Sequence, residues 1–215
     1  MTGTGQFCAV ARTLDILGGR WTLLVARELL LGSRRFNDIR RGIPRISKTM
    51  LAERLQALIG AGAVVPDDGG YRLTPAGAEL LGVVGALATW GQRWLPRDTT
   101  AEDLDLGPLL VDMRRRVVPG ALPQQPLVVR FQLKGHAMQM LLLKAGEVSL
   151  CTQNPGFPEL AVRGPLAPLA AWWRGDCSFL EAQQAGLVLD GPKPLARAFP
   201  RWFQRYLFAE VEAVQ

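Results

Sequence analysis

The sequence predicts two domains: a mainly α N-terminal domain that ends in a two-stranded hairpin, and an α+β C-terminal domain. Three observations predict this division. Apolar residues recur at helical spacing up to about residue 60, between breaks rich in glycine and proline. Strand-like alternation begins at about residue 128. Charge also differs between the halves: residues 1–97 carry 13 Lys and Arg against 7 Asp and Glu, whereas residues 98–215 carry 12 of each.

Three helices are expected at the start of the chain. The first covers about residues 10–17, with Val10, Leu14 and Leu17 on one face, and two glycines end it. The second covers about residues 20–31 and closes at Gly32. A short third helix begins near residue 36, and the run Gly-Ile-Pro at 42–44 breaks it. Helical spacing in the second helix relates Trp21, Leu24, Val25, Glu28 and Leu29.

A fourth helix is expected over about residues 48–60, with Ser47 as its N-cap. Its two faces differ in character. The apolar face consists of Met50, Leu51, Leu55, Leu58 and Ile59. The opposite face consists of Lys48, Thr49, Ala52, Glu53 and Gln56.

A hairpin and a long helix complete this half. Residues 64–65 and 71–73 read as short strands around the turn-rich segment 66–70. Thr74 caps a helix that has Pro75 at its first position and reaches about Trp94. Helices, a tight break and a hairpin in this order describe a winged helix-turn-helix, a fold that places one helix in a DNA major groove.

The long helix is apolar enough to need a partner. That partner is either its copy in a second subunit or the C-terminal half of the same chain. We expect a homodimer through residues 75–95, because a two-fold protein reads an inverted-repeat operator.

Basic residues gather around the predicted break. Six lie between residues 34 and 48, against the single acid Asp38. This cluster fits phosphate neutralisation, although a solvated positive face would have the same composition. Residues at the start of the helix after the break meet base edges in this fold. The expected DNA-binding residues are Arg34, Arg35, Arg40, Arg41, Arg45, Ser47, Lys48, Thr49 and Arg72.

Sequence patterns divide the chain into residues 1–96, for DNA binding and dimerisation, an acidic linker 97–108 and an α+β domain 109–215. The acidic segment also reads as a capped start of the next domain. In the last part, strands are expected near 128–134, 138–142, 148–152, 160–163 and 187–189. A two-residue hairpin turn is expected at Gly135-His136. Helices are expected near 166–173, 178–185 and 193–208.

Residues 8–95 resemble the HxlR-type winged-helix regulators, which are close to the MarR type. The resemblance is carried by the runs CAVAR at 8–12, LDILGGRWTLL at 14–24, RELLLG at 27–32, IPRISK at 43–48, LAERL at 51–55 and YRLTPAG at 71–77. It implies a dimeric regulator that binds double-stranded DNA. The wing departs from the family pattern because its tip, PDDGG, is acidic. We therefore expect Arg72, on the wing strand, to make the phosphate contact.

Residues 109–208 look like the sterol-carrier-type lipid-binding domain, through WWRGDCSFLEA at 172–182, GLVLDGP at 186–192 and ARAFPRW at 196–202. This resemblance implies an apolar cavity for a small-molecule ligand, with Arg130 or Arg163 available for a polar head. A filled core is the alternative, because such side chains also serve packing. The expected lining residues are Met138, Met140, Trp172, Trp173, Phe179, Phe199 and Trp202.

Other site types find little support. Cys8 lies just before the first helix, where amides lower a thiol pKa; it is a candidate redox or electrophile sensor or a small buried residue. One histidine and three scattered cysteines predict no metal site. No catalytic motif or nucleotide-binding motif occurs, so we expect neither an enzyme nor a cofactor. No membrane span or signal peptide is expected, which favours the cytoplasm.

The sequence thus favours a DNA-binding transcriptional regulator that responds to a ligand in its C-terminal domain. The alternative is a carrier of lipids or other hydrophobic ligands whose basic half binds a different acidic partner. Sequence-selective binding to duplex DNA separates the two.

Overall fold

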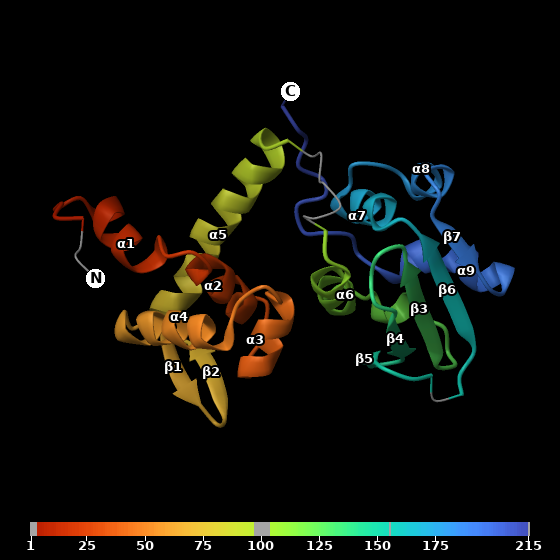
Figure 1. Ribbon diagram of the computed structural model, residues 1–215, viewed down its shortest axis with the longest axis horizontal. Coiled ribbons are helices and arrows are strands. Elements are labelled where there is room, and N and C mark those ends of the chain that lie inside the picture. Colours follow the sequence, from red (N-terminus) through yellow and green to blue (C-terminus); the bar gives the residue numbers. More distant parts are fainter. Residues whose placement is uncertain (1–3, 97–103, 155, 215) are drawn as a thin grey trace. The chain divides into compact units, whose positions relative to one another are not determined.

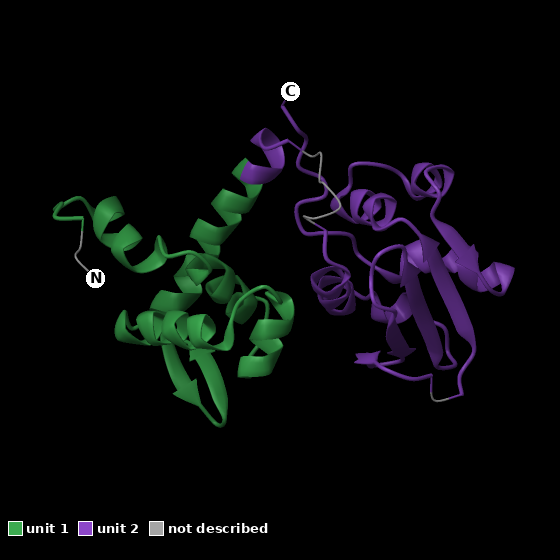
Figure 2. Ribbon diagram, in the orientation of Figure 1, with its two compact units in different colours: residues 1–90 green, residues 91–215 purple. Residues whose placement is uncertain are grey.

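The structure, a computed structural model, describes residues 4–96, 104–154 and 156–214. The chain divides into two compact units, residues 1–90 and 91–215 (Figure 2). Across the described residues, no helix combines the length and the apolar character that a membrane crossing needs.

The first unit is a helical bundle with a two-stranded wing (Figure 1). The two wing strands pair antiparallel. The last helix, α5, begins in the first unit, and its final residues after Trp90 belong to the second unit. The elements are α1 (Ala9–Leu17), α2 (Thr22–Leu30), α3 (Phe36–Gly42), α4 (Lys48–Gly60), β1 (Val64–Asp67), β2 (Gly70–Leu73) and α5 (Pro75–Trp94).

The core of this unit lies among α2, α3, α4 and the first wing strand. Its fully buried side chains include Val25, Ile39, Leu51, Leu55 and Leu58. Each such side chain contributes roughly 1.5–3 kcal/mol when it leaves water. Because α4 supplies three of them from one face, the core fixes which face of α4 is left for solvent.

The start of α5 is tied to the turn before the wing. The Thr74 hydroxyl donates to the carbonyl of Gly62 (2.6 Å) and accepts from the amide of Gly77 (3.1 Å). Gly77 lies so close to the Ala63 carbonyl that a Cβ would overlap it. Thr74 is therefore the cap that the sequence predicts, and a glycine is required one turn later.

The two N-terminal helices differ from expectation in their buried faces. In α1, Leu17 is buried, but Val10 and Leu14 are 66% and 53% exposed. In α2, Val25, Glu28 and Leu29 are buried, as their shared spacing indicates, but Leu24 lies at the surface. Helical spacing identified the residues that share a face, but it could not decide which side faces the core.

The second unit is a five-stranded mixed sheet with helices on one face. The strand order is β5-β4-β3-β6-β7; β3 and β6 are parallel and the other pairs are antiparallel. The elements are α6 (Leu106–Arg115), η1 (Pro119–Ala121), β3 (Leu127–Leu133), β4 (Gln139–Lys144), β5 (Glu147–Cys151), β6 (Glu159–Gly164), α7 (Leu166–Arg174), α8 (Phe179–Gln184), β7 (Val188–Asp190), α9 (Lys193–Ala198) and η2 (Phe199–Trp202).

The core of the second unit forms between the sheet and these helices. Alternate residues of the central strand, Val129, Phe131 and Leu133, point into it, and α6 and α7 cover them. This layer architecture is α+β, as the sequence predicts.

The end of the predicted linker forms a capped start of the next domain, which is the second of the two readings of this segment. Residues 97–103 of the predicted linker lie outside the described residues. Its last residues begin α6 instead, with Asp105 accepting a hydrogen bond from the Gly107 amide (2.9 Å). Pro108 is tolerated there because the first turn of a helix has amides without intrahelical partners.

Two further predictions for this unit are wrong. Strand β3 ends at Leu133 and β4 begins at Gln139, so five residues join them rather than a two-residue turn. The last paired residues of the two strands are Phe131 and Gln139. The predicted helix 193–208 ends at Ala198; a 3-10 turn containing Pro200 follows, and Phe203 is extended and pairs with Val117.

Candidate nucleic-acid interface

Helix α4 presents one polar face to solvent. The Ser47 hydroxyl accepts a hydrogen bond from the Met50 amide (3.1 Å), which fixes where the helix starts. Leu51, Leu55 and Leu58 are fully buried on the inner face. The opposite residues are all exposed: Lys48, Thr49, Ala52, Glu53 and Gln56.

Arginines are concentrated in the segment of chain that leads into α4. Arg34 and Arg35 precede α3, Arg41 lies near its end, and Arg45 lies in the turn before α4; all four are exposed. Arg40 is half-buried. The Arg41 guanidinium also pairs with Asp38 (2.7 Å), so this cation is partly neutralised.

A buried carboxylate holds the turn together beneath these arginines. Glu28 is 1% exposed and accepts from Arg27 (2.8 Å) and from the Ser33 hydroxyl (3.4 Å). Arg27 also donates to the carbonyl of Gly42 (3.3 Å). A Cβ at Gly42 would overlap the Glu28 carboxylate. The network joins α2 to the end of α3 and so positions the break that leads into α4.

The wing is attached to the same region through its backbone. The Tyr71 amide donates to the Arg34 carbonyl (2.9 Å). A Cβ at Gly70 would lie 2.6 Å from that oxygen, so a glycine permits the approach. On the strands, the Arg72 guanidinium lies 3.6 Å from the Asp67 carboxylate, and both side chains are half exposed. The wing carries one cation, Arg72, against two acids, Asp67 and Asp68.

The predicted DNA-binding residues therefore come from one continuous part of the first unit. They lie in the turn before α3, on α3, at the start of α4 and on β2. Sequence reasoning gave no role to Glu53 and Gln56, although it placed both on the polar face of α4. Their exposure is the signal that separates them from structural residues.

The predicted pocket residues of the second unit form a packed aromatic cluster instead. Trp172 contacts Trp173, Phe179 and Phe199 with ring centroids 5.0–5.9 Å apart, and Phe199 contacts Trp202. Met138 and Met140 do not join them. Met138 lies in the loop before β4 and is 47% exposed. Met140 pairs with Arg130, on the sheet face opposite the core.

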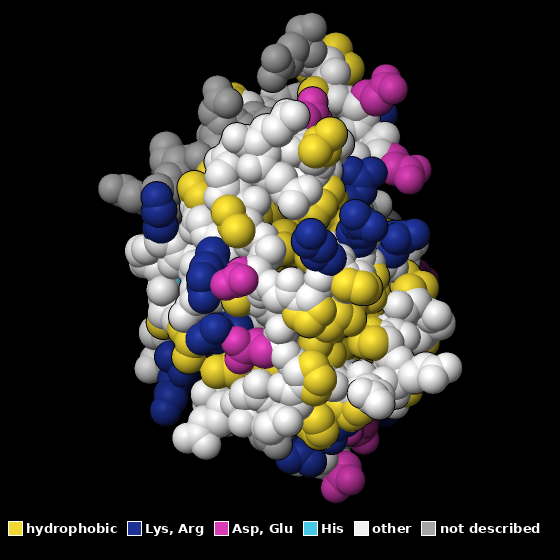
Figure 3. Space-filling view, turned by 90° about the vertical axis from the view of Figure 1, so that its right-hand side faces the viewer, with side chains coloured by type: hydrophobic (Ala, Val, Ile, Leu, Met, Phe, Trp, Pro, Cys, Tyr) yellow, Lys and Arg dark blue, Asp and Glu magenta, His cyan; other side chains and the backbone are white. Residues whose placement is uncertain are grey.

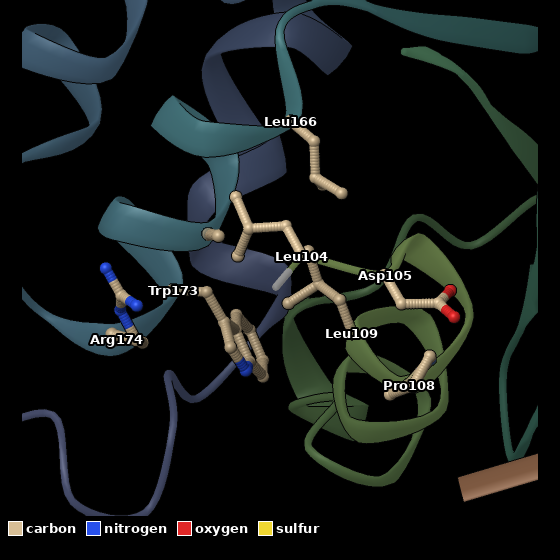
Figure 4. A pocket seen from close by; sticks show the side chains of 8 residues that line it. Leu104, Asp105, Pro108, Leu109, Leu166, Trp173 and Arg174 are labelled. Atoms are coloured by element: carbon tan, nitrogen blue, oxygen red, sulfur yellow. The ribbon is translucent and has the colours of Figure 1, made fainter. Parts of the chain in front are cut away.

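Neither arginine expected to hold a polar head group is available. Arg130 pairs with Glu159 (2.7 Å), and Arg163 pairs with Asp190 (2.9 Å). A different hollow of about 230 Å³ lies between the start of α6 and α7. Figure 4 shows Leu104, Leu109 and Leu166 around it beside the Trp173 ring, whose Nε1 donates to Asp112 (2.8 Å).

Cys8 is exposed at the start of α1. The backbone amides of Ala11 and Val10, in the first turn of α1, hold the pKa of the thiol below its usual value. Burial instead raises the pKa of Cys151 and Cys177. Within the part of the chain that the structure describes, no cluster of His, Cys, Asp or Glu is suited to a metal ion.

Comparison with known proteins places the first unit in a family. Residues 16–99 match the model of the HxlR-like helix-turn-helix. An uncharacterised HTH-type transcriptional regulator of Mycobacterium tuberculosis is 40% identical over 98 residues, which are 41% of this chain and 60% of that protein. The match therefore spans less than two thirds of the mycobacterial protein.

Two shorter relatives are matched over most of their length. The regulator YdeP of Bacillus subtilis is 34% identical over 42% of this chain and 76% of its own. The regulator YtfH of Escherichia coli is 37% identical over 45% of this chain and 82% of its own. Both are named uncharacterised HTH-type transcriptional regulators.

Solved structures include quinone-bound YodB of Bacillus subtilis, with 34% identity and a TM-score of 0.37 over 40% of this chain and 97% of that one. The oxidised redox regulator HypR has 32% identity and a TM-score of 0.37 over 43% of this chain and 100% of that one. The family model ends at residue 99, so the sterol-carrier resemblance of the second unit stays a prediction. The named relatives are transcriptional regulators rather than enzymes, and the chain belongs to the HxlR-like helix-turn-helix family.

Proposed function

We propose that the protein is a sequence-specific transcriptional regulator that binds double-stranded DNA through the N-terminal end of α4. The observation that carries this proposal is the exposed polar face of α4, which begins at a capped N-terminus and follows a segment rich in exposed arginines. A protein surface with this form matches a major groove bounded by phosphates.

The residues divide into two roles. Arg34, Arg35 and Arg45 lie in turns beside α4, where long cations reach phosphates and position the protein. Lys48 and Thr49 occupy the first turn of α4, where side chains meet base edges. Arg40, Arg41 and Arg72 contribute to the phosphate-binding surface, and Ser47 has the additional task of capping the helix.

Binding to duplexes from the DNA that flanks the protein's own coding region tests this proposal. Lys48→Ala should cost roughly 1–3 kcal/mol on the preferred duplex and relax its base preference. Arg35→Ala should weaken all duplexes alike and reduce the salt slope by about one. Arg197→Ala, an exposed cation in the second unit, is the matched control and should change neither. Equal affinity for unrelated duplexes at moderate salt would contradict the proposal and favour a hydrophobic-ligand carrier.

We further propose that the regulator is a homodimer through α5. In this 20-residue helix only Gly77 is buried, whereas Val83, Leu87, Trp90 and Trp94, which lie on one side of the helix, are 44–56% exposed. Such a continuous apolar stripe fits burial against a second copy. A two-fold dimer then predicts an inverted-repeat operator whose half-sites lie about one helical turn apart.

The hollow beside Trp173 supports a proposal for the second unit, that it senses a small apolar molecule. Its volume of about 230 Å³ lies between the roughly 150 Å³ that holds benzene and the roughly 300 Å³ at which drug-sized pockets begin. The ligand would change operator affinity only if it binds the DNA-competent and incompetent states unequally.

A further inference from the structure

One carboxylate lies on the face of α4 that the proposed function turns toward DNA. Thr49, Ala52, Glu53 and Gln56 follow one another at intervals that place them on one side of a helix. All four are exposed, and Glu53 is the only acidic residue of α4. Its side chain is 54% exposed.

Two other acids near the arginines lie beside cations, as Glu53 does. Asp38 pairs with Arg41 on α3, and Asp67 lies beside Arg72 on the wing. Glu53 lies 3.5 Å from its neighbour Arg54, whose side chain is only 16% exposed. The Arg54 guanidinium lies inward, close to Gly19. Its contact with Glu53 therefore holds one carboxylate oxygen of Glu53 near the body of the helix. A carboxylate has about four lone-pair sites, and this contact leaves it able to accept further hydrogen bonds.

A carboxylate in this position discriminates between bases for an electrostatic reason. It accepts hydrogen bonds and donates none, and it is repelled by phosphates. In the major groove, guanine presents two acceptors, and thymine presents an acceptor and a methyl group. Cytosine presents an amino donor, whereas adenine combines an amino donor with an acceptor. Only cytosine offers this carboxylate a donor without an adjacent acceptor on the same base.

We infer that Glu53 is a specificity-determining residue, and that it selects cytosine at one position of each half-site and rejects guanine and thymine there. This inference rests on the proposed function. Glu53 contributes little to overall attraction, because it opposes the positive field of the surrounding arginines. Glu53 acts on the difference in affinity between one duplex and another. A group that repels the wrong base increases this difference as much as a group that attracts the right one.

Duplexes that carry each of the four bases at every half-site position test the inference, with fluorescence anisotropy as the measurement. For the unmodified protein, replacing the preferred cytosine should weaken binding about 5- to 150-fold. Glu53→Ala should remove the preference at that position alone and should bind the poorer duplexes more tightly. Glu53→Gln should move the preference toward adenine, because an amide pairs with both groups of that base.

Glu79→Gln removes an exposed carboxylate from α5 and is the matched control for the loss of charge. It should leave the base preference unchanged. The inference is overturned if the base profile of Glu53→Ala equals that of the unmodified protein, or if no half-site position prefers a C·G pair in either orientation. If the unmodified protein shows no preference among duplexes at all, the proposed function itself fails. Thermal melts of each variant show whether the fold is intact.

Discussion

At the scale of single residues, Cys8 differs from the other two cysteines in what surrounds its sulfur. Amides of the first turn of α1 lower the pKa of its thiol, whereas burial raises the pKa of Cys151 and Cys177. Acidic neighbours, Glu181 first and then Asp176, raise the pKa of Cys177 further. The thiolate is the reactive form, so Cys8 is the cysteine on which an electrophile should act first.

Alkylation with iodoacetamide should therefore modify Cys8 faster than the other two at neutral pH. The rate at Cys8 should rise with pH and level off below the pH at which an ordinary thiol does, because the lowered pKa fills the thiolate earlier. Peptide mass spectrometry after timed quenching measures all three sites in one sample. A Cys8→Ser variant shows the background at Cys151 and Cys177. Equal rates at the three cysteines would contradict this account.

The polar residues of the first unit show what a sequence reveals at this scale. The exposure of Lys48 and Thr49 could be predicted, because the apolar face of α4 determines where the polar face lies. Glu28 shares its helical spacing with the buried Val25 and Leu29, although its charge alone predicts a surface position. The structure shows why a carboxylate is stable there: Glu28 accepts a hydrogen bond from the Ser33 hydroxyl and lies in the space that the absent side chain of Gly42 leaves open.

At the scale of elements, helices with strong caps were predicted with correct ends. Helix α4 begins after Ser47 and ends at Gly60, and α5 begins at Pro75 after its Thr74 cap, as the sequence indicates. Local chemistry was sufficient because a cap satisfies amides that the helix itself leaves without partners.

Elements that depend on distant contacts were harder to predict. Helix α6 was missed because Gly107 and Pro108 resemble a linker, and its burial depends on the sheet that follows. In β4 the predicted inner face was shifted by one residue. Leu141 and Leu143 face the core, while Met140 and Leu142 do not join it. A one-residue shift exchanges the two faces of a strand, and only the length of the preceding loop could have set the register.

Substitutions at Ser47 separate the stability of α4 from its contact with DNA. Ser47→Ala removes the cap and should lower the free energy of unfolding by about 0.5–2 kcal/mol. Ser47→Asp keeps a capping oxygen and should restore most of that loss. The same aspartate adds a negative charge beside Lys48, so it should weaken DNA binding more than alanine does. Urea unfolding and duplex titration measure the two effects; parallel changes in both would contradict this separation.

A substitution in α5 tests the proposed dimer. Leu87 is 50% exposed, so Leu87→Asp should leave the subunit folded while placing a charge in the apolar stripe. Light scattering at micromolar concentration should then report half the mass of the unmodified protein. Ala78→Asp adds the same charge on the opposite side of α5 and serves as the control. A monomeric unmodified protein, or an unchanged mass for Leu87→Asp, would contradict the dimer.

At the scale of the whole molecule, charge separates the two halves more clearly than hydrophobicity does. The net charge of +6 arises within residues 1–97. On the side of the molecule shown in Figure 3, Lys and Arg side chains lie among Asp and Glu side chains, with hydrophobic side chains exposed between them. An interspersed surface of this kind gives weak attraction to phosphates. We therefore expect the second unit to add little to DNA affinity, in keeping with the sensing role proposed for it.

Filling the hollow of the second unit tests that role. Ala170→Leu places a larger side chain in the space beside Trp173 and should abolish binding of benzene- to naphthalene-sized compounds in calorimetric titrations. In the unmodified protein, a bound compound should shift operator affinity by about 5–150-fold. Ala167→Leu, on the exposed side of α7, is the control. Compounds that bind Ala170→Leu equally well would exclude the hollow as their site.

The hydrogen bond from the Tyr71 amide to the Arg34 carbonyl has a consequence for motion. It closes a loop of chain that contains α3 and α4, so detachment of the wing must break it. The Tyr71 amide proton can then exchange with solvent only when the wing opens, and its exchange rate reports the free energy of that opening. DNA that contacts both the wing and the turn before α3 should slow this single exchange rate, even where neighbouring surface amides are unaffected.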